Sequence, residues 1–116
     1  MEPELRLVKE IRIRKPRQIF EGDTYFEVVM KSGYAIYRRS YNKASVMMFY
    51  NSVRGEILTV KKVEKLIDAG HLNIPLKYKY GYKRRYEILD LLTIIHALGL
   101  ADMQMWKREA VFALKT

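Results

Sequence analysis

Five cations alternate with four tyrosines between residues 77 and 86, and these side chains have the clearest potential for chemistry in the chain. The cations are Lys77, Lys79, Lys83, Arg84 and Arg85, and the tyrosines are Tyr78, Tyr80, Tyr82 and Tyr86. Lysine and arginine bind phosphate oxygens, arginine also reads guanine through two hydrogen bonds, and tyrosine rings stack on unpaired bases. The segment therefore predicts contact with nucleic acid, and a cationic face exposed only to solvent is the alternative interpretation.

A second cationic pair, Lys107 and Arg108, follows the single tryptophan of the sequence, Trp106. We expect this pair at the tip of a hairpin, where it could hold a sugar–phosphate backbone. The aromatic residues of both segments have two interpretations. Tyr78 and Tyr80 either stack on exposed bases or pack against the domain, and Trp106 either packs on a sheet or inserts into DNA.

The sequence contains no arrangement of residues with catalytic or metal-binding spacing. The two histidines, His71 and His96, are isolated, and no cysteine is present to form a disulfide, a thiolate zinc site or a nucleophile. Asp23, Glu27 and Lys31 lack the close carboxylate spacing that a shared magnesium ion needs. There is also no glycine-rich phosphate loop and no nucleophile elbow. We therefore predict no enzyme activity, no metal, no cofactor and no small-molecule substrate.

Length and charge are those of one globular domain with a polyanionic partner. The chain has 116 residues, of which 49% are hydrophobic and 30% are charged, so it can build a core of its own. Its net charge of +9 and pI near 9.8 favour nucleic acid or an anionic membrane surface. The basic segment has no apolar helical face before Ile88, so the membrane surface is the weaker choice. No apolar segment suits a signal core or a membrane span, and we expect an intracellular location.

The basic segment leads into the most strongly periodic stretch of the chain, a helix expected over residues 82–98. The apolar residues spaced to form one stripe of this helix are Ile88, Leu91, Leu92 and Ile95. Gly99 can end the helix in a left-handed conformation. Because a helix N-terminus attracts anions, a group of cations there indicates an anion outside the chain. Glu87 and Asp90 are interpreted as surface acids, with an ion pair between Arg84 and Glu87.

The N-terminal third has the period-two pattern of β-strands. Residues 4–15 alternate between apolar and charged side chains, which predicts one strand, and Pro16 either ends this strand or marks an edge. The apolar face of this strand consists of Leu5, Leu7, Ile11 and Ile13. Residues 21–23 are expected to form a loop, and residues 25–39 a hairpin that turns at Gly33.

Helix and strand signals alternate through the rest of the chain. Asn42 and Thr59 have side chains suited to cap the N-termini of two helices. The expected helices cover residues 43–54 and 60–69, a short strand covers 56–58, a loop covers 71–81, and a C-terminal hairpin covers 103–114 with its tip at 106–109. Together with the helix over 82–98, these elements complete the expected domain.

This order of elements resembles a winged helix-turn-helix over about residues 43–116. Residues 55–59, Gly-Glu-Ile-Leu-Thr, are similar to the small strand and cap before the second helix of that superfamily. Residues 96–100, His-Ala-Leu-Gly-Leu, are similar to its exit from the third helix into the wing. The loop of about eleven residues at 71–81 is longer than in most winged helices, so it is either a binding arm or the mark of another docking mode.

The resemblance implies an α+β fold of one domain, residues 1–116, with three helices and a C-terminal hairpin wing over 43–116. An N-terminal strand and hairpin over residues 1–41 lie outside the resemblance, and they either extend the wing sheet or form a dimer surface. The superfamily places its third helix in the major groove of duplex DNA and its wing on the backbone or the minor groove. By this analogy Arg84 and Arg85 lie near the groove, the loop lysines contact phosphates, and the wing tip grips the flanking backbone.

We therefore expect a small DNA-binding protein, either a transcriptional regulator or a nucleoid-type protein, that acts by occupying duplex DNA. Two other functions stay open. The N-terminal strands could pair edge to edge with a second copy of the chain or with another protein. The tyrosine-rich loop would also suit an RNA-binding component of a ribonucleoprotein.

Overall fold

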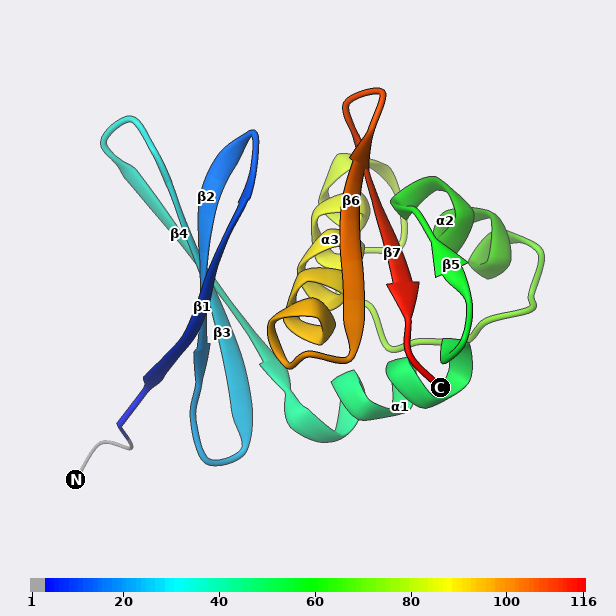
Figure 1. The fold of residues 1–116 in the computed structure, drawn as a ribbon, viewed down its shortest axis with the longest axis horizontal. Helices are drawn as coiled ribbons and strands as arrows, with labels where there is room; N and C mark the ends of the chain where they lie inside the picture. The colour runs from blue at the N-terminus through cyan, green and yellow to red at the C-terminus, as the bar shows by residue number, and fades with distance from the viewer. Residues whose placement is uncertain (1–3) are drawn as a thin grey trace.

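Two antiparallel sheets and three helices make up the part of the chain that the computed structural model describes, residues 4–116 (Figure 1). The first sheet has the order β1-β2-β3-β4, from β1 (Arg6–Ile13), β2 (Lys15–Glu21), β3 (Tyr25–Ser32) and β4 (Ala35–Asn42). The second sheet has the order β5-β7-β6, from β5 (Ile57–Leu58), β6 (Ala101–Trp106) and β7 (Glu109–Leu114). The helices are α1 (Lys43–Val53), α2 (Val60–Asp68) and α3 (Gly81–Ala97). These elements confirm the predicted α+β class.

The N-terminal sheet contains a strand that the sequence did not predict. β1 and β2 form a hairpin around Arg14, which has a positive φ of 64°. Pro16 therefore lies inside a strand, so the first of its two interpretations, that it ends a strand, is wrong. β3 pairs with β2 only from Arg17 onward, so Pro16 lies where β2 has one neighbouring strand and where a residue without an N–H is tolerated.

A bulge in β1 changes which of its side chains face the core. The register of β1 against β2 shifts between Leu7 and Lys9. A shift of one residue turns the side chains beyond it to the opposite face of the sheet. Ile11 is therefore buried, whereas Leu7, which the alternation placed on the same face, is half exposed.

The helices α1 and α2 begin where their capping residues predict. The side-chain oxygen of Asn42 accepts a hydrogen bond from the backbone N–H of Ala44 at 2.8 Å, and Thr59 Oγ1 accepts one from the N–H of Lys62 at 3.2 Å. These bonds satisfy donors that the first turn of a helix leaves without partners. None of the helices within residues 4–116 is long and apolar enough to cross a membrane.

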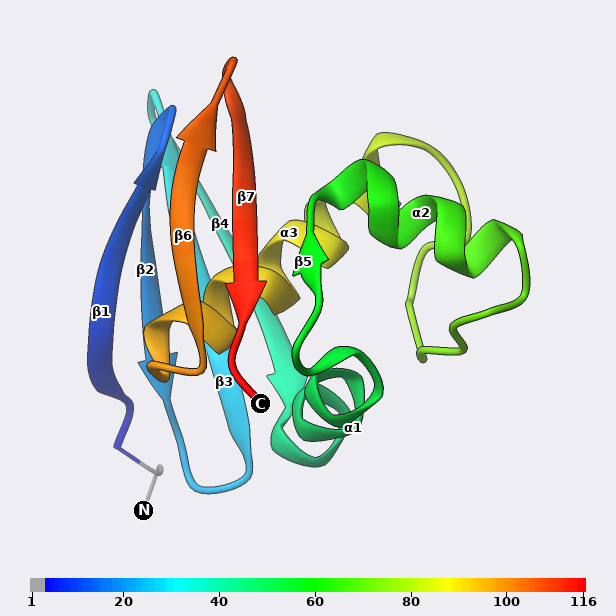
Figure 2. The same cartoon turned by 45° about the vertical axis from the view of Figure 1, so that its right-hand side comes forward.

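α3 is the central element of the fold. It runs between the N-terminal sheet and the β6–β7 hairpin (Figure 1 and Figure 2), and it contacts α1, α2, β6 and the strands β1, β2 and β3. The fully buried side chains Ile88, Leu92 and Ile95 of α3 share one core with Ile19 of β2 and Phe112 of β7. The N-terminal strands thus form a separate sheet that covers α3, and the expectation that they extend the C-terminal sheet is wrong.

Candidate nucleic-acid interface

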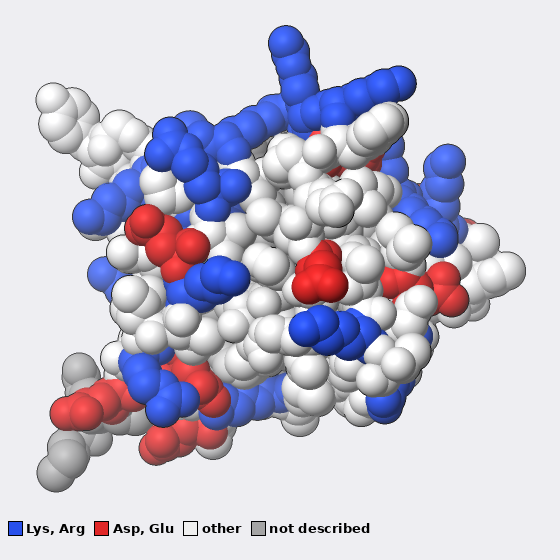
Figure 3. Space-filling model, viewed as in Figure 1, with Lys and Arg blue, Asp and Glu red and all other residues white. Residues whose placement is uncertain are grey.

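Cations from four separate segments gather at one end of the molecule. The β1–β2 turn, the β3–β4 turn, the N-terminus of α3 and the β6–β7 turn lie at the upper end in Figure 1. Figure 3 shows Lys and Arg side chains along this upper edge, whereas Asp and Glu side chains are most numerous at the lower left and are scattered over the rest of the face. We call this surface the basic end. Its exposed cations are Arg14, Lys15, Lys31, Lys83, Arg85, Lys107 and Arg108.

A groove of about 460 Å³ lies between strands β2 to β4 and the first turns of α3, and we call it the tyrosine groove. Its lining residues are Lys15, Met30, Ser32, Tyr37, Arg38, Arg39, Tyr78, Tyr82, Lys83 and Tyr86. Four of these carry a positive charge, four are tyrosines and none is acidic. The groove therefore combines cations and aromatic rings from two regions of the chain that are far apart in the sequence.

The tyrosine groove continues along β4. A second hollow of about 510 Å³ shares Arg38, Arg39 and Tyr78 with it. This second hollow is also lined by Asn42 at the end of β4 and by Lys77 in the loop before α3. The two hollows together follow the boundary between the N-terminal sheet and that loop.

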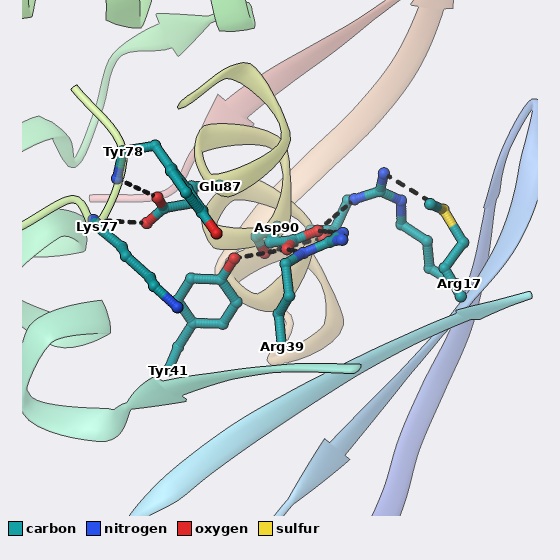
Figure 4. Close-up of polar contacts among 9 residues, drawn as sticks. Arg17, Arg39, Tyr41, Lys77, Tyr78, Glu87 and Asp90 are labelled. Carbon is teal, nitrogen blue, oxygen red and sulfur yellow. Dashed lines mark hydrogen bonds and ion pairs between the residues drawn. The ribbon is translucent and has the colours of Figure 1, made fainter. Parts of the chain in front are cut away.

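Asp90 of α3 holds Arg39 in the floor of the groove (Figure 4). The Asp90 carboxylate accepts hydrogen bonds from Nε and Nη2 of Arg39, the latter at 3.0 Å, and from the hydroxyl of Tyr41 at 2.5 Å. Arg17 Nη1 donates to the same carboxylate at 2.7 Å. The Arg39 guanidinium lies 5.8 Å from the ring centroid of Tyr86, a cation–π contact on the groove wall.

The pKa values of the three side chains that donate to Asp90 are shifted for different reasons. The hydrogen bond to Asp90 raises the pKa of Arg39 above its ordinary value. Desolvation lowers the pKa of the more deeply buried Arg17, although its pairing with Asp90 opposes that effect. Burial, followed by the nearby carboxylate of Asp90, raises the pKa of Tyr41, so its hydroxyl stays protonated as a donor.

Glu87 of α3 fixes the loop that carries Tyr78 (Figure 4). Its two carboxylate oxygens accept hydrogen bonds from the backbone N–H groups of Lys77 at 3.0 Å and of Tyr78 at 2.6 Å. The ammonium of Lys83 then lies 5.1 Å from the ring centroid of Tyr78. Glu87 and Asp90 are both buried, so their interpretation as surface acids is wrong.

Arg84 has a structural role within the chain. Its guanidinium donates to Glu64 at 2.8 Å, to Asp68 at 2.9 Å and to the carbonyl oxygen of Lys79 at 3.1 Å. These bonds raise the pKa of Arg84 and tie the N-terminus of α3 to α2. The predicted ion pair between Arg84 and Glu87 does not form, and Arg84 is not part of the candidate interface because its side chain is buried.

The other predicted residues of the basic segment remain accessible. Lys77, Lys79, Lys83 and Arg85 are all exposed. Tyr78 lines the tyrosine groove, whereas Tyr80 is 82% exposed and lies outside the groove lining. The packing interpretation is therefore wrong for Tyr80.

The β6–β7 turn presents its cations at the basic end. Lys107 and Arg108 form the turn between Trp106 and Glu109, which pair with each other. The Trp106 ring is 65% exposed, and the Lys107 ammonium lies 5.7 Å from its centroid. The interpretation of Trp106 as a residue packed on the sheet is therefore wrong.

Sequence reasoning missed the half of the groove that β2 and β4 supply. The sequence patterns place Lys15, Tyr37, Arg38 and Arg39 only in a strand or a hairpin. A signal was present, because the stretch Tyr-Arg-Arg-Ser-Tyr at residues 37–41 repeats the mixture of cations and tyrosines found at 77–86. Comparing the composition of the two stretches could have identified them as parts of one surface.

The described residues 4–116 contain no group of three or more His, Cys, Asp or Glu side chains that could hold a metal ion. His71 is exposed, and His96 Nδ1 lies 2.6 Å from the carbonyl oxygen of Ala101. The cations and tyrosines of the groove can form ionic contacts, hydrogen bonds and aromatic stacking contacts. Comparisons with known protein families, with curated proteins and with solved structures find no match to this chain.

Proposed function

We propose that this chain is a nucleic-acid-binding protein of the winged helix-turn-helix type, which acts by occupying its ligand and not by catalysis. The order α1-β5-α2-α3-β6-β7 and the sheet order β5-β7-β6 support that type. In this proposal the β6–β7 hairpin is the wing. The observation that carries the proposal is the gathering of cations from four segments at the basic end, along the upper edge in Figure 3.

The position of α3 decides how duplex DNA would be contacted. A winged helix normally inserts its third helix into the major groove. Here the middle of α3 is buried between the two sheets, and only its first turns expose side chains. The exposed residues of those turns are Tyr82, Lys83, Arg85 and Tyr86. Duplex DNA would therefore be held mainly through its phosphates, which favours a sequence-tolerant, nucleoid-type protein over a site-specific regulator.

Fluorescence anisotropy with labelled duplex DNA across a salt series tests this proposal. The logarithm of the affinity should fall with the logarithm of salt concentration, with a slope of about −0.9 for each neutralised phosphate. A Lys83/Arg85/Arg108 triple-Ala variant should bind more weakly and with a shallower slope. A Lys9/Lys65/Lys115 triple-Ala variant is the matched control, because these exposed lysines lie outside the segments of the basic end. Binding that does not depend on salt, or equal losses in the two variants, would contradict the proposal.

A second candidate function is association of two copies through β4. β4 is an edge strand of its sheet, and its side chains Ile36 and Tyr37 are about half exposed. Edge strands with exposed apolar residues can pair with another chain. Sedimentation velocity would detect this association, and an Ile36→Lys variant should abolish a dimer formed in this way.

A further inference from the structure

We propose that the tyrosine groove binds an unpaired stretch of nucleic acid, with bases stacked on its tyrosine rings and phosphates against its cations. This inference rests on the proposed function and extends it from the basic end to a second surface. Duplex DNA hides the faces of its bases in the stack, whereas a single strand can turn them outward. A groove that offers rings as well as cations therefore suits an unpaired strand.

The tyrosine rings of the groove are accessible to a ligand. Tyr82 is 60% exposed, Tyr37 is 48% exposed and Tyr86 is 44% exposed. None of the three rings belongs to the buried core of residues 4–116. Exposed aromatic rings in a concave, cationic setting are the pattern by which proteins bind single strands with little sequence preference.

The groove is organised before any ligand enters. Asp90 fixes the Arg39 guanidinium through two of its nitrogens, and Glu87 fixes the backbone next to the Tyr78 ring. The rings of Tyr82 and Tyr86 also meet edge to face, with centroids 5.8 Å apart. Binding to such a surface orders few protein side chains, so less entropy is lost when a strand is bound.

The tyrosine groove and the second hollow form one continuous path. The two hollows share three lining residues and together extend from Lys15 and Lys83 at the basic end to Lys77 and Asn42. Lysine and arginine side chains recur along this path, at Lys15, Lys83, Arg38, Arg39 and Lys77. The second hollow is also lined by Glu87, whose carboxylate accepts hydrogen bonds from the loop backbone. A phosphate backbone needs this repetition of charge, which a pocket for a single small molecule does not.

The test compares oligonucleotides that differ only in having bases. Fluorescein-labelled oligothymidylate of about eight nucleotides, the matching abasic oligonucleotide and a blunt-ended duplex are titrated by anisotropy. The wild type should bind oligothymidylate about tenfold more tightly than the abasic strand, because each stacked base adds affinity. Oligouridylate of the same length shows whether RNA or DNA is the preferred source of the strand.

A tyrosine double variant with a matched control locates the binding. Tyr37→Ala with Tyr82→Ala should remove the preference for bases over the abasic strand. Tyr34→Ala with Tyr80→Ala removes two highly exposed tyrosines that do not line the groove, and this control should keep the preference. Thermal unfolding verifies that both double variants are folded. The comparison of thymidylate with the abasic strand on wild-type protein does not depend on either variant.

The outcomes separate this inference from the proposed function. If the duplex binds but thymidylate and abasic strands bind equally, the basic end holds nucleic acid and the groove inference is overturned. Equal losses in the two tyrosine variants overturn it as well. If no oligonucleotide binds at low salt, the proposed function fails together with the inference.

Discussion

Arg17 of β2 and Asp90 of α3 form an ion pair whose Nη1–Oδ1 distance is 2.7 Å, and their side chains are only 3% and 0% exposed. The pair joins the N-terminal sheet to the central helix. Arg39 and Tyr41 of β4 donate to the same carboxylate, so Asp90 connects the second and fourth strands of that sheet to α3. The sheet that covers α3 is therefore attached by a polar centre as well as by apolar packing.

Replacing Asp90 by Asn should destabilise the protein strongly. The variant keeps the size of the side chain but leaves the buried Arg17 charge without its counterion, a loss of about 3–5 kcal/mol in the free energy of unfolding. Urea denaturation would measure this loss. Asp102→Asn, at an exposed position of β6, is the control and should change stability by less than about 0.5 kcal/mol. A loss below about 1 kcal/mol for Asp90→Asn would show that the ion pair contributes little.

Arg84 and Arg85 are adjacent in the sequence but should behave oppositely when replaced by Ala. Arg84→Ala removes the partner of Glu64 and Asp68 and should destabilise the protein by about 1–3 kcal/mol. Arg85→Ala should leave stability within about 0.5 kcal/mol and weaken duplex binding. Chemical denaturation and anisotropy on the same samples separate the two effects. Comparable destabilisation by both variants would contradict this division of roles.

The two cations of the turn between β6 and β7 should lower the stability of the protein and strengthen its binding to duplex DNA. Lys107 and Arg108 have φ values of 47° and 68°, a region that favours Asn and Gly in two-residue hairpin turns. A Lys107→Asn, Arg108→Gly variant should therefore unfold with a free energy about 1–2 kcal/mol higher. The same variant should bind duplex DNA more weakly because it lacks two cations.

The charge-preserving exchange Lys107→Arg, Arg108→Lys is the control for the turn. It keeps both the charges and the unfavourable backbone, so neither stability nor binding should change. If the Asn-Gly variant gained no stability, the strain would be negligible. If it bound as tightly as the wild type, the turn would lie outside the interface.

Asp68 should make stability dependent on pH in the acid range. The hydrogen bond from Arg84 lowers the pKa of Asp68 below its ordinary value of 3.8. A lowered pKa in the folded state stabilises the protein above pH 3.8 and loses that contribution as the pH falls through the folded pKa. Asp68→Asn should therefore lower the melting temperature at neutral pH and match the wild type in strong acid. A difference that persists unchanged at the lowest pH would contradict this origin.

The elements from residue 42 onward could be predicted because their signals are local. Asn42 and Thr59 begin their helices as capping residues do, and the apolar stripe of α3 has helical spacing. The strand β2 could not be found in this way. Its buried Arg17 looks like a surface residue in the sequence, and its partner Asp90 is 73 residues away. Only the folded chain brings the two charges together.

The part of the candidate site that has a local signal could also be predicted from the sequence. The cations and tyrosines of residues 77–86 stand out by composition, and most of them are accessible in the structure. Burial of Arg84 could not be foreseen, because its acid partners lie on another helix. The contribution of β4 to the tyrosine groove depends on the packing of the N-terminal sheet against α3, which no local pattern encodes.

The packing of the N-terminal sheet on α3 has a consequence for synthesis of the protein. The four strands leave the ribosome before α3, so their apolar face, with Ile19 and Val28, is for a time uncovered. Such faces and the open edges of β-sheets promote aggregation of nascent chains. The arginines that flank this sheet in β1 and β4 oppose association of such chains by mutual repulsion. The same positive charges can thus limit aggregation of the nascent chain and later form part of the charged surface of the folded protein.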